Sequence, residues 1–301
     1  MNFDGIFTPV ITPLLPSGEI DHAAFSDILE YLIDSRVHGI VVGGSTGEYY
    51  AHTTEERLAL IARASDVING RLPLVIGTGA IRTEDSIVFA QAARRHKANA
   101  ILVGSPPYAL PTQQEIAAHV LTVDQAASLP IMLYNYPARM GVSMGESFYA
   151  ALDGCKNVIA IKESSGDMHS LHRLAQYHPD IQISCGWDDQ ALEYFAWGAR
   201  SWVCAGSNFI PAEHVALYET CVLEKDFDKG RKIMTAMLPL MDFLEGGKFV
   251  QSIKYGCELN GLRTGGVRQP LKGLNDAEKE SLRVVIETLR KTVSSIVGGA
   301  W

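Results

Sequence analysis

A lysine stands at the end of a segment that otherwise has the pattern of a buried β-strand. Residues 158–161 are apolar, three of the four are β-branched, and Lys162 follows them before a polar stretch that contains glycine. This pattern is typical of a strand that is buried on both faces and gives way to a loop. A buried lysine has a lowered pKa, and its neutral amine attacks a carbonyl carbon to form a Schiff base. The alternative is a structural lysine that pairs with a nearby carboxylate such as Glu163.

Polar groups that follow other apolar runs fit the same chemistry. The segment 43–48 reads Gly-Gly-Ser-Thr-Gly-Glu, and its backbone amides with the hydroxyls of Ser45 and Thr46 suit a carboxylate. Tyr134 offers a phenolic proton, and Arg139 offers a planar fork for a second anionic group. Taken singly, these residues are also consistent with an ordinary turn, a packing tyrosine and a surface ion pair. Together with the lysine they predict a site for a 2-keto acid.

Eight short apolar runs alternate with helical patterns along the first two thirds of the chain. The runs predict strands at residues 6–11, 39–43, 72–77, 100–103, 130–134, 158–162, 181–184 and 201–204. Helical patterns with start signals lie between them, for example residues 57–68 after Thr53 and residues 87–95 after Thr83. Each crossover is long enough to return the chain parallel to the preceding strand. The sequence therefore predicts an α/β fold, the (β/α)8 TIM barrel, whose active site lies at the carboxyl ends of the strands.

The last part of the chain has a different pattern. After about residue 210 the strand signal fades, and helices are predicted, among them residues 227–244 and 276–296. One helix suffices to close the barrel, so the surplus predicts a C-terminal helical extension packed on it. No Ser-rich or Pro-rich linker marks a flexible boundary. We expect a catalytic barrel at residues 1–223 and the extension at residues 224–301.

Composition excludes several other classes of protein. The chain has 301 residues, 47% of them hydrophobic, and a formal net charge of -8, which argues against a general nucleic-acid surface. Its five cysteines are widely spaced and form no CxxC pair, so neither a disulfide framework nor a zinc site is expected. No apolar stretch reaches the roughly 18 residues of a membrane span, and the N-terminus lacks a signal-peptide pattern. We expect a cytoplasmic protein that acts without nucleic acid or membrane.

The motifs at the strand ends resemble those of a known family. Residues 44–48, 134–139 and 161–166 look like the motifs of the dihydrodipicolinate synthase and N-acetylneuraminate lyase family, in the same order along the chain. The resemblance extends from residue 5 to about residue 289. It implies a class I Schiff-base lyase in which Lys162 forms an imine with pyruvate or another 2-keto acid. It also implies that no metal or organic cofactor takes part.

The resemblance implies roles for further residues. Ser45 and Thr46 would hold the keto-acid carboxylate, and Tyr134, Ser45 and Tyr108 would relay protons. Tyr108 would reach into the site of a neighbouring subunit, within a homotetramer built as a dimer of dimers. Substrate contacts are further expected from four residues at the ends of the last strands or in the loops that follow them: Gly186, Trp187, Val203 and Asn208. We expect Asn208 and its neighbour Ser207 at the rim of the site.

Several positions leave the second substrate open. Arg139 resembles the arginine with which dihydrodipicolinate synthases bind the carboxylate of the aldehyde, which favours a small acidic partner. Ser45 replaces the usual threonine, Trp187 stands where aspartate is common, and residues 249–254 replace the usual Asn-Pro-x-Pro-Val-Lys. The last two differences are more typical of the family's sugar-acid aldolases and deaminases. The positions of the lysine-feedback site are poorly matched, so no inhibition by lysine is expected; these positions are Tyr49, Tyr50, Ile81 and Pro107.

The leading interpretation is an aldol condensation of pyruvate with a small aldehyde acid, as in 4-hydroxy-tetrahydrodipicolinate synthases. The rivals within the family are a pyrroline-4-hydroxy-2-carboxylate deaminase or dehydratase and a 2-keto-3-deoxy sugar acid aldolase. An interpretation from another class is a non-catalytic ligand-binding barrel. Retention of Lys162, Tyr134 and the hydroxyl pair at residues 45–46 argues against it.

Overall fold

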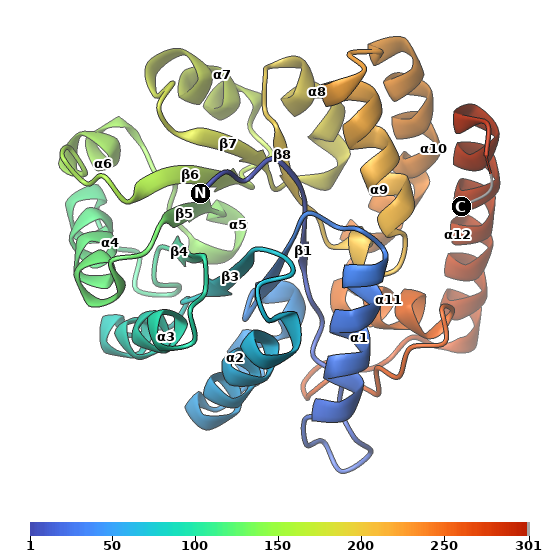
Figure 1. Cartoon of the computed structure of the whole chain (residues 1–301), viewed down its shortest axis with the longest axis horizontal. Helices are drawn as coiled ribbons and strands as arrows, with labels where there is room; N and C mark the ends of the chain where they lie inside the picture. The colour runs from blue at the N-terminus through green and yellow to red at the C-terminus, as the bar shows by residue number, and fades with distance from the viewer. Residues whose placement is uncertain (300–301) are drawn as a thin grey trace.

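Eight parallel strands close into a barrel at the centre of the molecule (Figure 1). The structure is a computed structural model and describes residues 1–299. The strands are β1 (Gly5–Pro9), β2 (Gly39–Val42), β3 (Leu74–Gly77), β4 (Ala100–Gly104), β5 (Ile131–Asn135), β6 (Val158–Glu163), β7 (Gln182–Cys185) and β8 (Ser201–Val203). Each pairs with the next along the chain, and β8 pairs with β1, where Gly5 is opposite Ser201. The predicted TIM barrel is confirmed, with every strand end within two residues of its expected position.

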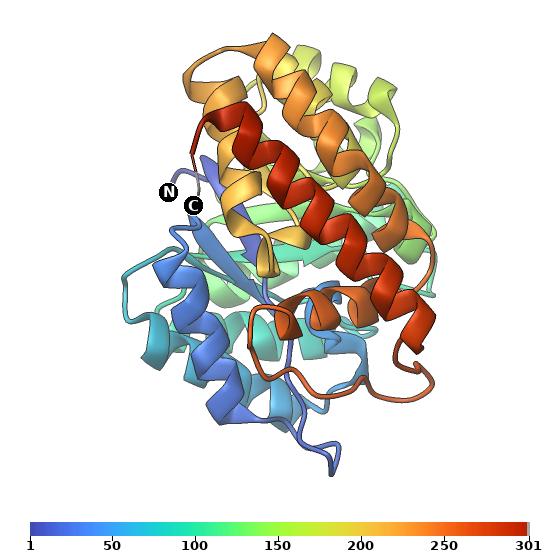
Figure 2. The same ribbon diagram turned by 90° about the vertical axis from the view of Figure 1, so that its right-hand side faces the viewer.

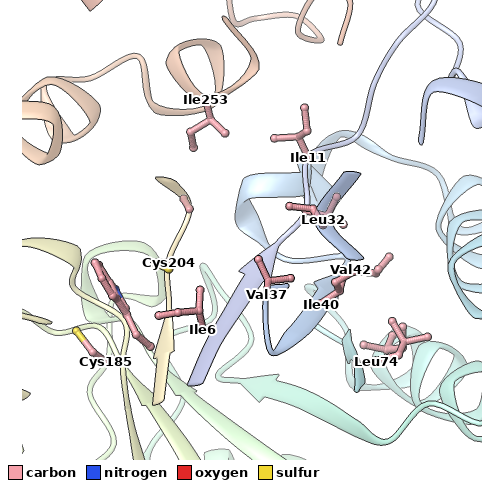
Figure 3. Close-up of a cluster of buried hydrophobic side chains, with 14 of the residues drawn as sticks. Ile6, Ile11, Leu32, Val37, Ile40, Val42, Leu74, Cys185, Cys204 and Ile253 are labelled. Carbon is pink, nitrogen blue, oxygen red and sulfur yellow. The ribbon is translucent and has the colours of Figure 1, made fainter. Parts of the chain in front are cut away.

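The strands are buried on both faces, which explains their continuous apolar runs. Phe7, Val41 and Met132 belong to a cluster inside the barrel, whereas Ile6, Ile40 and Ile101 belong to a larger cluster between the strands and the helices. Figure 3 shows part of the larger cluster, with Ile6 and Ile40 on adjacent strands. Inside the barrel the packing is close, because a Cβ atom added to Gly39 would lie 2.2 Å from the Phe7 ring.

Helices surround the barrel and return the chain between strands (Figure 1). They are α1 (His22–Asp34), α2 (Thr54–Ile68), α3 (Thr83–Arg95), α4 (Gln113–Ala127), α5 (Pro137–Met140), α6 (Glu146–Ala151), α7 (Met168–Tyr177), α8 (Ala191–Ala196) and α9 (Pro211–Tyr218). The start signal at Thr53 is a capping box, in which its hydroxyl accepts from Glu56 N–H and the Glu56 carboxylate accepts from Thr53 N–H. Thr83 instead lies inside the first turn of α3, after Arg82.

Three helices form the C-terminal part of the chain: α10 (Phe227–Glu245), α11 (Phe249–Glu258) and α12 (Asp276–Val297). Figure 2 shows α12 running diagonally beside α10, with α11 near its lower end. The helices predicted at residues 227–244 and 276–296 are confirmed. Residues 300–301, the end of the predicted extension, lie outside the described residues. Nowhere between residues 1 and 299 is a helix both long and apolar enough to span a membrane.

Candidate active site

Lys162 lies near the carboxyl end of β6 and points into a cavity at that end of the barrel. Lys162 is 9% exposed, and burial lowers the pKa of its amine below the ordinary range of lysine. The Nζ atom lies 4.5 Å from the centroid of the Tyr134 ring. A lowered pKa increases the fraction of neutral amine at a given pH, which is the nucleophilic form.

Glu163 does not pair with Lys162, so the structural alternative from the sequence is wrong. Successive residues of a strand face opposite sides, and the Glu163 carboxylate accepts hydrogen bonds from Asn135 Nδ2 at 2.7 Å and Ser165 N at 2.7 Å. Among the described residues, no carboxylate lies within ion-pair distance of Lys162 Nζ. The lysine is therefore a buried amine without a salt bridge, and burial keeps its charged form unfavourable.

Tyr134 is the register partner of Lys162, on the adjacent strand β5. Burial raises the pKa of the phenol, and the nearby hydroxyls of Ser45 and Ser164 partly oppose this effect. The phenol therefore keeps its proton at neutral pH. A protonated phenol between a hydroxyl and an amine is suited to passing a proton to or from a group that reacts with the amine.

The turn after β2 forms a second wall of the cavity. Ser45–Gly47 forms one 3-10 turn. The backbone amides of Ser45 and Thr46 are at its N-terminal end, where N–H groups have no acceptor within the turn. Both residues line the cavity. Gly47 packs closely behind them, since an added Cβ would lie 2.8 Å from Val10 O. Two amides and two hydroxyls at one point are suited to binding a carboxylate.

The same cavity collects eight of the ten residues predicted to form the site. They are Ser45, Thr46, Tyr134, Arg139, Lys162, Gly186, Trp187 and Val203. The Arg139 guanidinium lies 5.5 Å from the centroid of the Tyr136 ring. Trp187 packs edge-on against the same ring, with centroids 6.4 Å apart. The cavity thus holds an amine, a phenol, a hydroxyl and amide cradle and a guanidinium.

The two remaining predicted residues lie elsewhere. Tyr108 is 92% exposed, has a φ of 73°, and does not line the cavity of its own chain. Asn208 is fully buried: its Nδ2 donates to Pro9 O and Ala205 O, and its Oδ1 accepts from Ile11 N. Ser207 is equally buried.

The expected rim position is therefore wrong for Ser207 and Asn208. Their side chains are used in joining the ends of β1 and β8, because the Ser207 hydroxyl bonds the Thr8 hydroxyl at 2.7 Å and donates to Cys204 O at 2.7 Å. Buried polar groups with these partners are already satisfied.

Three polar residues without a predicted role in the site also line the cavity: Tyr136, Asp188 and Glu245. Phe249, the first residue of the segment 249–254 that departs from the family pattern, lines it as well. Burial raises the pKa of Asp188, whose carboxylate accepts from Trp202 Nε1 at 2.9 Å and Ala205 N at 3.4 Å. Burial also raises the pKa of Glu245. Tyr136 and Asp188 stand next to predicted residues, so the strand-end pattern could have found them. Glu245 and Phe249 come from the C-terminal helices, whose position over the barrel has no local signal.

The described residues contain no group of three or more histidine, cysteine, aspartate or glutamate side chains that could hold a metal ion. Their cysteines are free thiols, and Cys185 and Cys204, at the ends of β7 and β8, are fully buried (both labelled in Figure 3). The chemistry that the cavity offers is that of a nucleophilic amine with a proton donor beside it.

Comparison with known proteins gives one consistent result. A model of the dihydrodipicolinate synthetase family matches residues 2–289. The 4-hydroxy-tetrahydrodipicolinate synthase of Exiguobacterium sibiricum is 36% identical over 98% of this chain and 100% of its own, and that of Bacillus subtilis is 32% identical over 96% and 100%. The solved structure of the synthase from Methylacidiphilum fumariolicum SolV superposes with a TM-score of 0.91 and 27% identity, covering 99% of both chains.

Proposed function

The chain belongs to the dihydrodipicolinate synthetase family, and we propose that it is a lyase that condenses pyruvate with a small aldehyde acid through a Schiff base on Lys162. The observation that carries this proposal is a buried amine without an ion pair, next to a protonated phenol and the carboxylate cradle at residues 45–46. The names of the compared relatives support the same reaction, 4-hydroxy-tetrahydrodipicolinate synthesis.

The reaction begins with Schiff-base formation. Lys162 Nζ attacks the keto carbon of pyruvate, and loss of one water leaves a protonated imine. Ser45 and Thr46 hold the pyruvate carboxylate, which directs the keto carbon toward the amine. Tyr134 supplies the proton with which the hydroxyl leaves as water, and it recovers a proton afterwards.

Carbon–carbon bond formation follows from the imine. The protonated imine withdraws electrons, so the neighbouring methyl carbon loses a proton and an enamine forms. The enamine carbon bonds to the aldehyde carbon of the second substrate, and the aldehyde oxygen takes up a proton to become a hydroxyl. Water, or an amine carried by the second substrate, then displaces Lys162. Tyr134 is placed to carry the proton in each step.

Arg139 is the group proposed to bind the second substrate. Its guanidinium lines the cavity, and among the described residues it forms no salt bridge. A planar guanidinium fork binds a carboxylate in a bidentate manner. The size of the second substrate is limited by the aromatic wall of Tyr136, Trp187 and Phe249.

The aromatic side chains that line the cavity also support a second candidate function. Trp187 and Phe249 both line the cavity, and they occupy the two positions at which the sequence departs toward the aldolases and deaminases of the family. The rival reactions are removal of water or ammonia from a five-carbon acid such as pyrroline-4-hydroxy-2-carboxylate, or cleavage of a 2-keto-3-deoxy sugar acid. They would use the same imine on Lys162.

We also propose that the enzyme is a cytoplasmic homotetramer. Tyr108 is almost fully exposed, and Tyr50, Ile81 and Leu110 are further exposed apolar residues on neighbouring loops. Exposed apolar side chains at one end of a barrel support self-association. In such an assembly the Tyr108 phenol would complete the proton relay of a neighbouring subunit. Light scattering should give a mass of four chains, and a stable monomer would contradict this part of the proposal.

A turnover panel tests the proposed function. Pyruvate is offered with aspartate semialdehyde, and hydroxy-pyrroline carboxylate and several 2-keto-3-deoxy acids are offered separately. We expect turnover with pyruvate and aspartate semialdehyde and at least 100-fold lower kcat/KM with the other compounds, on the scale by which enzymes separate dissimilar substrates. Turnover confined to the pyrroline or the deoxy acids would reject the condensation and support the second candidate.

A further inference from the structure

A buried ion pair joins the C-terminal helices to the turn that forms the carboxylate cradle. Glu48 directly follows the Ser45–Gly47 turn, and its carboxylate lies 2.6 Å from Lys254 Nζ on α11. The two side chains are 1% and 3% exposed. A buried charge is stable only with its partner, so this pair is a strong constraint on the relative position of the two segments.

Each member of the pair has a second contact in the loop that follows α11. Lys254 Nζ donates to Gly266 O at 2.7 Å, and the Glu48 carboxylate accepts from Arg268 N at 3.3 Å. Burial lowers the pKa of Lys254, and the attraction of Glu48 opposes that effect. The turn, the helix and the loop therefore meet at one pair of charges.

Arg268 forms a second link to the same part of the chain. Its Nη1 donates to Ala51 O at 2.7 Å and to the Glu56 carboxylate at 2.7 Å, and its Nη2 pairs with Glu56 and donates to Gly18 O. Ala51 lies between the cradle and α2, and Glu56 lies in the first turn of α2. The C-terminal loop thus holds the segment after β2 at two points, one on each side of residues 49–50.

The backbone at the cradle needs such support. Glu48 has a φ of 57° and a ψ of 32°, the left-handed region that a residue with a side chain seldom occupies. On the barrel side, Thr12 Oγ1 donates to Gly47 O at 2.8 Å. Helix α11 packs against the same turn, and its Ile253, next to Lys254, is fully buried in the cluster that includes Ile11 (Figure 3).

We infer that the Glu48–Lys254 pair, held by the C-terminal helices, positions the amides and hydroxyls of Ser45 and Thr46 for the carboxylate of the keto acid. Glu48 and Lys254 are positioning residues, because they act through the turn and do not line the cavity. The inference rests on the proposed function in one respect, namely that residues 45–46 bind that carboxylate. It gives the C-terminal extension a part in substrate binding.

The test is a double variant that removes both charges, Glu48→Gln with Lys254→Met. Removing both avoids the unpaired buried charge that a single variant would leave. A displaced cradle weakens a contact made in both the ground state and the transition state, so KM for pyruvate should rise about 10-fold or more while kcat changes by less than about 3-fold. KM for the second substrate should stay unchanged.

A matched control uses an exposed pair on the same extension. Glu224 and Lys229 form an ion pair of 3.2 Å, and the variant Glu224→Gln with Lys229→Gln should keep the pyruvate KM of the wild type. A folded Glu48/Lys254 double variant with an unchanged pyruvate KM would overturn the inference. An equal rise in the control variant would overturn it as well, because the effect would then not belong to the cradle.

A milder variant tests the inference if the double variant does not fold. Arg268 is only partly buried, and Arg268→Gln removes its links to Ala51 and Glu56. It should raise the pyruvate KM in the same direction by a few-fold, and an unchanged KM would overturn the inference. Failure of the proposed function is recognised separately, since the wild type would then form no adduct with pyruvate on borohydride reduction.

Discussion

Tyr134 and Lys162 are register partners on β5 and β6, and the lysine Nζ lies 4.5 Å from the centroid of the tyrosine ring. The pairing places a phenol and an amine side by side at the carboxyl ends of two strands. Burial affects the two groups in a complementary way, because it lowers the pKa of the amine and raises that of the phenol. Burial thus favours the neutral form of both groups.

Replacement of Tyr134 by phenylalanine should separate binding from proton transfer. Tyr134→Phe keeps the ring beside Lys162 and removes only the hydroxyl. We expect kcat to fall by about 10²–10⁴, the usual contribution of a positioned acid–base group, while KM for pyruvate changes little. Steady-state kinetics checks this prediction. A kcat within about 3-fold of the wild type would show that another group moves the proton.

The pH dependence of kcat/KM for pyruvate should follow the deprotonation of the Lys162 amine. Imine formation needs neutral Lys162, so kcat/KM for pyruvate should rise with pH through the lysine pKa and then level off. Because burial lowers that pKa, the rise should be centred below the ordinary range of lysine. After burial, which lowers the Lys162 pKa, the largest influence is the attraction of Asp188, which raises it. Asp188→Asn should therefore shift the rise to lower pH.

The pH experiment has an internal check. An amide oxygen at residue 188 still accepts from Trp202 Nε1, so Asp188→Asn removes the charge and keeps this hydrogen bond. A rise centred in the ordinary lysine range, or a shift to higher pH in the variant, would contradict the assignment of the titrating group to a desolvated Lys162.

Arg139 should act on the second substrate alone. Arg139→Gln removes a charged fork but keeps a donor, and the loss of a charge-assisted pair should raise KM for the second substrate about 10-fold to 100-fold. KM for pyruvate should stay within about 2-fold. Two-substrate kinetics measures both values. An equal rise in both would place Arg139 at the pyruvate carboxylate instead.

Lysine should leave the enzyme active. Tyr49 and Tyr50 fill part of the region after the cradle, where their rings pack edge-on with centroids 6.0 Å apart, and the Arg57 guanidinium lies over the Tyr49 ring. Together with Ile81 and Pro107, the two tyrosines occupy positions at which the family resemblance implies small, amide and tyrosine groups in lysine-inhibited members. Activity assays with millimolar lysine should give the same rate as assays without it. A clear loss of activity would contradict this prediction.

The sequence predicted the part of the site that follows from local pattern. An apolar run with β-branched residues specifies a buried strand, and the first polar residue after it is then at the carboxyl end of the barrel. The sequence thus indicated Lys162, Tyr134, Ser45 and Thr46, which line one cavity. It also placed Asn208 at a strand end, but a polar residue there is free to bond its own backbone neighbours, as Asn208 does.

The contribution of the C-terminal helices could not be predicted in this way. Glu245 and Phe249 reach the cavity, and Lys254 reaches Glu48, only because α10 and α11 fold back over the barrel. Glu48 and Lys254 are too far apart along the chain for the period of a helix or a strand to relate them. In the sequence, Glu48 ends a glycine-rich motif. Nothing in the residues next to it along the chain indicates that its carboxylate has a buried partner.

Reduction with borohydride in the presence of pyruvate tests the central claim most directly, because it traps the imine on its lysine. The intact mass of the wild-type chain should increase by one reduced pyruvate adduct, and peptide mapping should place the adduct on Lys162. The Lys162→Ala variant should show no increase under the same conditions. An unmodified wild-type chain, or an adduct that persists in Lys162→Ala, would contradict the assignment of Lys162 as the Schiff-base nucleophile.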